Sequence, residues 1–176
     1  IVFVNGHYDA ALSSVAELPD GVVVESLANV LDSSPDSMGI EQCLGKGADI
    51  HSDSAAFAAL NTALFRDGVF VRVAANVVVD SPIQMLFITT SQSTDPDAME
   101  SPMTHPRILI VAEENSQLRL VETYAGETNT AYLTNVVTEV VAGENAAIDH
   151  YKLVREASVA YHIGHMHLRL SRSANF

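Results

Sequence analysis

The chain has 176 residues, of which 48% are hydrophobic and 18% are charged. This composition indicates a folded domain with a hydrophobic core and excludes a disordered chain. The 22 acidic and 9 basic residues give a formal net charge of −13. Such a charge argues against nucleic acid and anionic membranes as partners, because both are themselves negative.

The chain carries one cysteine, Cys43. This count excludes a disulfide framework and a cysteine-based zinc or iron–sulfur site built from this chain alone. It fits a reducing compartment, so we expect a cytoplasmic protein. No run of 18 apolar residues and no signal peptide are apparent, and the sequence predicts no membrane span. Cys43 itself is expected to be a small packed side chain rather than a nucleophile.

Residues 1–50 are expected to form a small, mixed and partly helical region. A short apolar strand over residues 1–4 ends at the turn pair Asn5-Gly6. A second turn signal over residues 18–21 precedes a β-branched run over residues 22–24, which predicts another strand. A short helix is expected over residues 26–31.

The clearest helical pattern covers residues 52–66. Phe57, Leu60 and Leu64 fall at positions i, i+3 and i+7, and alanines fill the same face. We expect this face to pack against an apolar surface. Residues 51–68 are therefore predicted to be a helix that caps the domain that follows.

From residue 69 onward, short strand-like segments repeat. Residues 110–115, 140–145 and 170–175 align at intervals of 30, and residues 71–76 align at an interval of 39 if residues 91–105 are an inserted loop. The alignment superposes three sets of positions: Val71, Ile110, Val140 and Leu170; Val79, Leu118 and Ile148; and Asn76, Asn115, Asn145 and Asn175.

A period near 30 residues with two or three short strands per unit predicts a β-solenoid over residues 69–176. The recurring asparagine is expected at a corner in left-handed geometry. An ordinary β-sandwich is the alternative. The last repeat stops at Phe176 and the first residue is not methionine. We expect the native chain to continue beyond this open end, or a partner or second copy to cover it.

His165 and His167 are candidate metal ligands. They share one strand face and lie about 7 Å apart by strand rise. They supply only two of the three or four ligands that a metal site needs. His162 has the opposite parity and is expected on the other face. The alternative is a solvated or interface-facing strand.

Four carboxylates lie on the strand-rich part: Glu113, Glu114, Glu122 and Glu139. Paired carboxylates perform acid–base chemistry and glycoside cleavage. Nothing in their spacing shows that they converge, and neither a nucleophile elbow nor a phosphate-binding loop is present. We therefore predict that the chain is not an enzyme. The remaining alternatives are a β-helix carbohydrate-active enzyme and a plain structural or binding solenoid.

Several stretches, in this order and spacing, resemble SufD of the SUF iron–sulfur cluster assembly system, within the SufB/SufD family. They are residues 2–6 (VFVNG), 60–70 (LNTALFRDGVF), 76–79 (NVVV), 82–87 (PIQMLF), 105–107 (HPR), 113–117 (EENSQ), 134–139 (TNVVTE), 143–146 (GENA) and 150–153 (HYKL). SufB-like sequences tend to carry a cysteine directly after the Val-Glu pair at residues 121–122. This chain has Thr123 there, which favours SufD.

The resemblance implies a right-handed parallel β-helix and a non-enzymatic scaffold that pairs with a SufB-like subunit and is served by a SufC-like ATPase. It implies a transient iron–sulfur cluster at the interface with SufB and ATP on SufC, with no cofactor bound by this chain alone. The family's late interface histidine and its SufC-binding helices lie beyond the residues matched here. No cluster ligand is therefore carried over, and His165 and His167 have no known family role.

Overall fold

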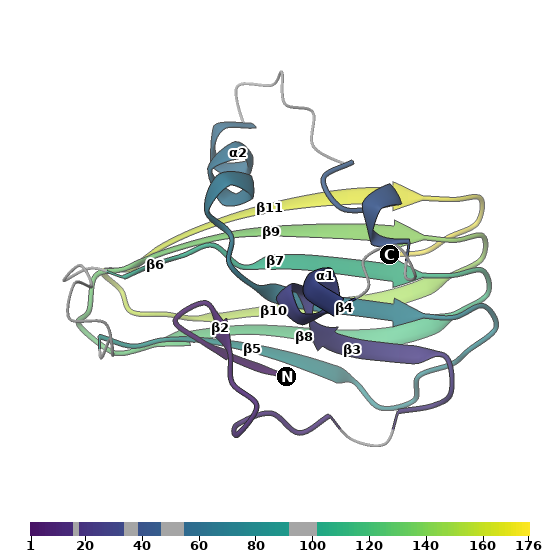
Figure 1. The fold of residues 1–176 in the computed structure, drawn as a ribbon, viewed down its shortest axis with the longest axis horizontal. Coiled ribbons are helices and arrows are strands. Elements are labelled where there is room, and N and C mark those ends of the chain that lie inside the picture. The colour runs from purple at the N-terminus through teal and green to yellow at the C-terminus, as the bar shows by residue number, and fades with distance from the viewer. Residues whose placement is uncertain (16–17, 34–38, 47–54, 92–101) are drawn as a thin grey trace.

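The computed structural model describes residues 1–15, 18–33, 39–46, 55–91 and 102–176 (Figure 1). The helices are α1 (Leu27–Ser33), the short 3₁₀ helix η2 (Ile40–Gln42) and α2 (Ala55–Leu64). The strands are β1 (Val2–Val4), β2 (His7–Tyr8), β3 (Val22–Ser26), β4 (Gly68–Val73), β5 (Ile83–Thr89), β6 (Met103–Thr104), β7 (Arg107–Ala112), β8 (Gln117–Gly126), β9 (Leu133–Ala142), β10 (Ala147–Arg155) and β11 (Tyr161–Leu170). The expected mainly β class is confirmed. None of the helices in these ranges is long and apolar enough to cross a membrane.

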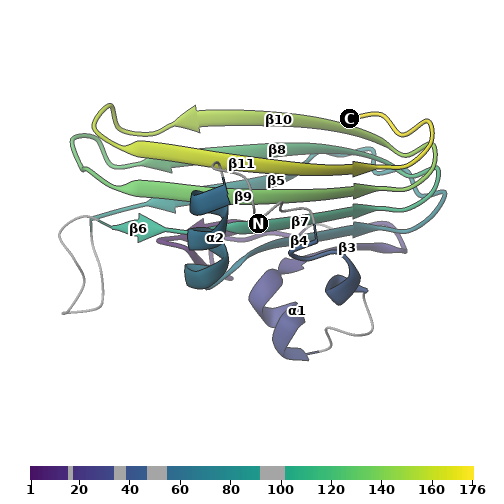
Figure 2. The ribbon, with the colours of Figure 1, turned by 90° about the horizontal axis from the view of Figure 1, so that it is seen from above.

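The strands form two sheets that face each other (Figure 2). The first, the β8 sheet, has the order β10-β8-β5-β1-β2, and the second, the β9 sheet, has the order β11-β9-β7-β4-β3 with β6 beside β9. From β4 to β11 the chain alternates between them, except that β6 and β7 both lie in the β9 sheet, and each added strand runs parallel to its neighbour. Only β1–β2 and β3–β4 are antiparallel pairs within the described ranges. This parallel stacking differs from an ordinary antiparallel sandwich.

The hydrophobic core lies between the sheets. Because side chains alternate along a strand, Leu118 and Leu120 of β8 and Val136 and Val140 of β9 point inward. β4 and β7 are buried on both faces, since α1 and η2 cover the outer face of the β9 sheet at Phe70 and Leu109. Because these strands are buried on both faces, their sequences are continuous apolar runs rather than alternating apolar and polar residues.

The expected superposition holds for the first three repeats and fails for the last. Val71 pairs with Ile110 and Ile110 with Val140, as predicted. Val140, however, pairs with Leu168 rather than Leu170. Ala125 and Arg155 are paired, yet Leu133 pairs with Tyr161, so the connection after β10 is two residues shorter than the one after β8. The prediction assumed a constant period and was wrong there. The predicted loop at residues 91–105 lies mostly outside the described residues.

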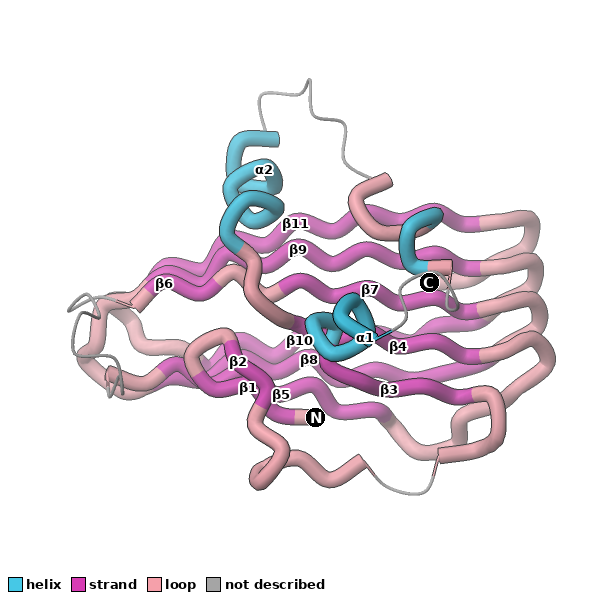
Figure 3. Tube along the Cα trace, viewed as in Figure 1, coloured by secondary structure: helices cyan, strands magenta, loops and turns pink. Residues whose placement is uncertain are grey.

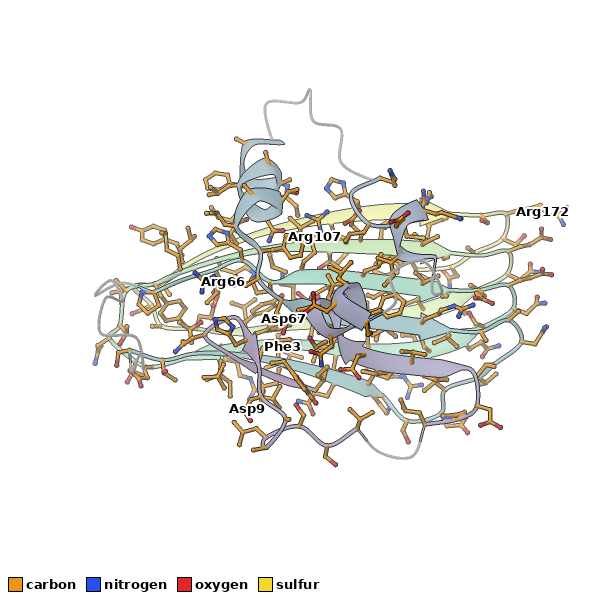
Figure 4. The ribbon with its side chains drawn as sticks, in the orientation of Figure 1. Phe3, Asp9, Arg66, Asp67, Arg107 and Arg172 are labelled. Atoms are coloured by element: carbon orange, nitrogen blue, oxygen red, sulfur yellow. The ribbon has the colours of Figure 1, made fainter. Side chains whose placement is uncertain are left out.

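Residues with a left-handed backbone conformation lie in the turns at one edge of the stack, where the turns lie above one another (Figure 3). Asn76, Asn115 and Asn145 have φ values of 64°, 56° and 57°, which confirms the expected corner. Asn115 Nδ2 donates to Asn76 Oδ1 at 3.0 Å, and Asn145 Nδ2 donates to Asn115 Oδ1 at 3.1 Å. The next corner position is Ser173, with φ 59°, not the predicted Asn175, because of the two-residue shortening. Arg172 projects from this edge in Figure 4.

We expect Asn115→Ala to lower the free energy of unfolding by about 1–2 kcal/mol, because alanine resists left-handed geometry. Asn115→Gly removes the same side-chain hydrogen bonds but adopts this geometry freely, so its cost should stay below about 0.5 kcal/mol. Urea unfolding of the two variants measures the difference. Equal losses for both would mean that the side-chain ladder, rather than backbone geometry, stabilises the corner.

The orientation of α2 differs from the prediction. Ala58 and Asn61 are buried against the β9 sheet, whereas Phe57, Leu60 and Leu64 are 42%, 37% and 47% exposed. The prediction that this apolar face packs on the domain was therefore wrong. The cause lies in the surface beneath the helix, which is polar and is bound by the amide of Asn61, as described below. Residues 52–54 of the predicted helix lie outside the described residues.

The predicted division of the chain into residues 1–50, 51–68 and 69–176 stays a prediction. Within the first of these segments, β1 extends the β8 sheet beside β5, and β3 extends the β9 sheet beside β4. Asp67, at the entry to β4, accepts hydrogen bonds from Ser26 Oγ at 2.8 Å and from the Ala28 amide at 3.0 Å, next to α1 (Figure 4). These contacts tie the early residues to the stacked sheets.

Candidate functional site

Six polar side chains lie between the sheets, near the end of the stack formed by β10 and β11. We call this group the interior polar cluster; it consists of Glu122, Tyr124, His150, Lys152, Glu156 and His162. Strand register explains how β8 and β10 contribute to it. His150 pairs with Leu120, and Lys152 pairs with Glu122. Paired residues of neighbouring strands lie on the same face of a sheet, so both side chains face the interior.

Glu122 is the centre of the cluster and is fully buried. Tyr124 Oη donates to its Oε1 at 2.6 Å. His150 Nε2 lies 2.7 Å from its Oε2, and Lys152 Nζ lies 3.2 Å from its Oε1. A buried carboxylate is costly unless it is paired and hydrogen-bonded, and here both oxygens have such partners.

Burial alone raises the pKa of Glu122, but the hydrogen bond from His150, the charge of Lys152 and the hydrogen bond from Tyr124 outweigh it, so its pKa is lowered. Burial, together with the charge and hydrogen bonding of Glu122, raises the pKa of Tyr124 well above 10.0. At neutral pH the carboxyl of Glu122 is therefore ionised and Tyr124 remains a hydrogen-bond donor.

A lowered carboxyl pKa stabilises the fold above the ordinary glutamate pKa of 4.5, and that contribution is lost as the pH falls through the folded value. We therefore expect the unfolding free energy to fall less between pH 5 and pH 3 in Glu122→Gln than in the wild type. Urea unfolding across this range measures the two slopes. Parallel pH profiles would show that Glu122 is not held ionised by its partners.

A second carboxylate, Glu156, orients His162. His162 Nδ1 lies 2.7 Å from Glu156 Oε2, and Thr134 Oγ1 donates to Glu156 Oε1 at 2.6 Å. The imidazole meets the Tyr124 ring edge-on, with centroids 4.6 Å apart. His162 thus faces the interior, which confirms its expected parity. Its Nε2 is buried and makes no hydrogen bond to the described part of the chain.

His165 and His167 lie on the outer face of β11, where they pair with Val137 and Glu139. Both are half-buried, and His167 Nε2 has no hydrogen-bond partner among the described residues. Across those residues, no three His, Cys, Asp or Glu side chains are grouped so that they could hold a metal ion. We therefore assign no metal to this pair, which on its own provides too few ligands.

The outer face of the β9 sheet carries a different buried cluster beneath α2, where Figure 4 labels Arg107. Arg107 Nε donates to Glu139 Oε1 at 2.8 Å, and Gly45 N–H donates to Glu139 Oε2 at 2.8 Å. Arg107 Nη1 donates to Asn61 Oδ1 at 3.1 Å, and Asn61 Nδ2 donates to the Asn135 carbonyl at 2.8 Å. These bonds attach α2 and the Gly45 loop to the sheet, so we read the cluster as structural.

The four carboxylates considered as acid–base candidates do not converge. Glu113 binds Arg72 near the turn edge, Glu122 lies inside and Glu139 lies on the outer face. Glu114 follows Glu113 in the same turn. Cys43 is a half-buried free thiol that packs against the cluster beneath α1, as expected.

Sequence reasoning assigned no role to His150, Lys152 or Glu156, and it treated Glu122 as one carboxylate among four. One signal was available for Glu122: it occupies an inward position in the alternation Leu118, Leu120, Glu122, Tyr124, where a charge requires partners. The 30-residue register then places His150 and Lys152 beside it. Glu156 lies in a connection, whose side-chain direction no periodicity predicts.

The chain matches two family models. One describes the SufBD protein N-terminal region and matches residues 1–85; the other describes the SufBD core domain of SUF-system iron–sulfur cluster assembly and matches residues 91–176. An iron–sulfur cluster assembly SufBD family protein of Synechocystis is 32% identical over 93% of this chain and 35% of its own length.

Two further relatives cover similar regions. The chloroplastic protein ABCI7 of Arabidopsis thaliana is 24% identical over 92% of this chain and 33% of its own length. The iron–sulfur cluster assembly protein SufD of Bacillus subtilis is 28% identical over 80% of this chain and 30% of its own length. The chain thus spans about a third of the length of these relatives.

Proposed function

The chain belongs to the SufB/SufD family of the SUF iron–sulfur cluster assembly system, and from this we propose that it is part of a SufD-like, non-enzymatic scaffold subunit of a SufBCD complex. The observation that carries the proposal is that two family models together account for residues 1–85 and 91–176. The match to a protein named SufD and the absence of a cysteine at Thr123 favour SufD over SufB.

The proposed architecture is a right-handed parallel β-helix. It is supported by the alternation of the chain between two sheets and by the parallel pairing of each added strand. Such a stack is rigid, because each strand is held by a neighbour of the same sheet and by the core that the two sheets share. We infer that this rigidity is what the chain contributes to assembly.

In this proposal the cluster is cargo. A SufB-like partner supplies the thiolates, since Cys43 is the chain's one cysteine and packs beneath α1. A SufC-like ATPase binds and hydrolyses ATP, and this chain alone binds no cofactor. The complex works in the cytoplasm, where thiols stay reduced. Separated carboxylates favour a scaffold over a β-helix carbohydrate-active enzyme, which needs two of them on either side of a glycosidic bond.

A genetic experiment tests the cellular role. The native gene that carries this sequence is deleted, and growth and the activities of iron–sulfur enzymes are measured with and without an iron chelator. We expect a loss of both that deepens under iron limitation and is restored by the gene. Wild-type enzyme activities under chelation would instead favour a plain structural solenoid, and release of oligosaccharides from acidic polysaccharides by the purified protein would favour the enzyme alternative.

A further inference from the structure

The two sheets differ in what lies over their outer faces. α1 contacts β4 and β7, and α2 contacts β9, so both helices lie on the β9 side of the stack (Figure 2). The outer face of the β8 sheet also carries apolar side chains. We call these the outer β8 patch; it consists of Leu86 and Ile88 of β5, Val121 and Thr123 of β8, and Tyr151 and Leu153 of β10. Parallel sheets are normally covered on both faces, so this patch is a candidate contact surface.

Strand register makes the patch continuous across three strands. The alternate positions of β8 belong to the core, so Val121 and Thr123 point outward. Thr123 pairs with Leu86 on one side and with Leu153 on the other. Val121 pairs with Tyr151, whose side chain is 55% exposed. The apolar groups therefore lie side by side instead of being scattered over the face.

Charged side chains bound the patch at both ends of β8 and β10. Arg119 and Asp149 occupy paired positions near the turn edge, with side chains 48% and 64% exposed. Glu127 and Arg155 lie at the opposite end, where the Ser91 N–H donates to Glu127 Oε2 at 3.0 Å. All four charges continue the outward alternation of their strands. Each end of the patch therefore carries one acid and one base.

This arrangement of charges is self-complementary. The midpoint between Asp149 and Arg155 is position 152, and the midpoint between Arg119 and Glu127 is position 123, which pairs with position 153. The two midpoints thus lie one residue apart on neighbouring strands. A two-fold axis that crosses the strands there, in the plane of the patch, reverses the strand direction. It brings Asp149 opposite Arg155 of the second copy, and it brings Arg119 opposite Glu127 of the second copy.

We propose that the outer β8 patch is a self-association surface, on which a second copy of this chain packs face to face about a two-fold axis. The same operation brings Tyr151 opposite Leu153 of the second copy, so the apolar centre is buried between the charges. Facing sheets lie about 10 Å apart with strand directions within about 30° of each other, which suits this packing. In a two-fold contact every pair is made twice. The inference goes beyond the proposed role in cluster assembly and does not depend on it.

The net charge of −13 on each copy opposes association. At 0.15 M salt, however, repulsion between exposed charges more than about 8 Å apart is largely screened. The short-range pairs at the two ends of the patch are screened less, so the local complementarity should decide the outcome. We therefore choose this ionic strength for the tests.

Sedimentation equilibrium of the native protein that carries this sequence, purified on its own, tests the surface. Tyr151→Glu places a carboxylate of each copy in the apolar centre, where it has no partner. Because Tyr151 is 55% exposed, the variant should fold, and far-UV circular dichroism checks this. We expect the mass of the wild type to rise with concentration to twice that of Tyr151→Glu. Equal masses at every concentration would overturn the proposal.

Charge reversal tests the two-fold arrangement itself. Arg155→Glu and Asp149→Arg should each raise the Kd of self-association at least about tenfold, because each turns two attractions into repulsions. The double variant restores opposite charges across the axis, so its Kd should return to within about threefold of the wild type. Lys46→Glu makes the same change of charge beside the Gly45 loop on the β9 side and should leave Kd unchanged. A double variant as weak as the single variants, or an equal loss in Lys46→Glu, would refute the arrangement.

Discussion

Arg107→Met is expected to lower the free energy of unfolding by about 3–5 kcal/mol. Arg107 and Glu139 are both buried beneath α2, with side chains 2% and 3% exposed. Removing the guanidinium leaves the Glu139 carboxylate in the interior, where the Gly45 N–H is its remaining hydrogen-bond donor among the described residues. It also removes the donor that holds Asn61, so the attachment of α2 should weaken with the sheet.

Arg72→Met is the matched control. Arg72 of β4 and Glu113, directly after β7, form the same kind of pair, but their side chains are 35% and 32% exposed. A solvent-exposed pair contributes about 0–1 kcal/mol, so this variant should unfold almost like the wild type. The double variant Arg107→Met with Glu139→Leu should recover part of the loss, because no unpaired charge stays buried. Equal losses for Arg107→Met and Arg72→Met in urea unfolding would contradict this reading of the outer cluster.

Gly68→Ala is expected to cost about 3–5 kcal/mol or to prevent folding, as clashes with rigid backbone do. A Cβ atom at Gly68 would lie 1.7 Å from the carbonyl oxygen of Arg107 and 2.7 Å from its amide nitrogen. These are backbone atoms of β7, the parallel neighbour of β4, so no side-chain rotation relieves the contact. The two strands would have to separate where they begin.

Gly39→Ala separates this clash from the general cost of replacing glycine. Gly39 has φ +67°, and a Cβ there would meet nothing within 4 Å. Its replacement should cost about 1–2 kcal/mol through backbone geometry alone. The yield of soluble protein and the midpoint of urea unfolding compare the two variants. Gly68→Ala with the stability of Gly39→Ala would show that β4 and β7 are less closely apposed than described.

The strands and their stacking were predictable from local pattern. Val71, Ile110 and Val140 align at intervals of 39 and 30 residues because each occupies the same inward position on neighbouring strands of one sheet. The last repeat was missed because connection length is not encoded in strand alternation, and a connection shorter by two residues moves the corner to Ser173. Within β11 the alternation of side chains between the two faces of the strand was still predicted correctly. It placed His162 on the opposite face from His165 and His167.

The face of α2 and the interior polar cluster were not predictable in the same way. An apolar stripe indicates which side of a helix is hydrophobic, but Arg107 and Glu139 make the surface beneath α2 polar, and Asn61 binds it. The cluster brings Glu122, Lys152 and His162 together from three strands. Such contacts depend on register between distant segments, which one sequence indicates only through its weak repeat.

The most direct test of the scaffold proposal is the mass of the complex. The native protein that carries this sequence is co-expressed with SufB-like and SufC-like partners, purified through a tag on the SufB-like subunit, and weighed by native mass spectrometry. The proposal predicts one assembly that contains all three proteins and, in resemblance to the family, two copies of the ATPase. Recovery of the SufB-like and SufC-like subunits without this protein would contradict it.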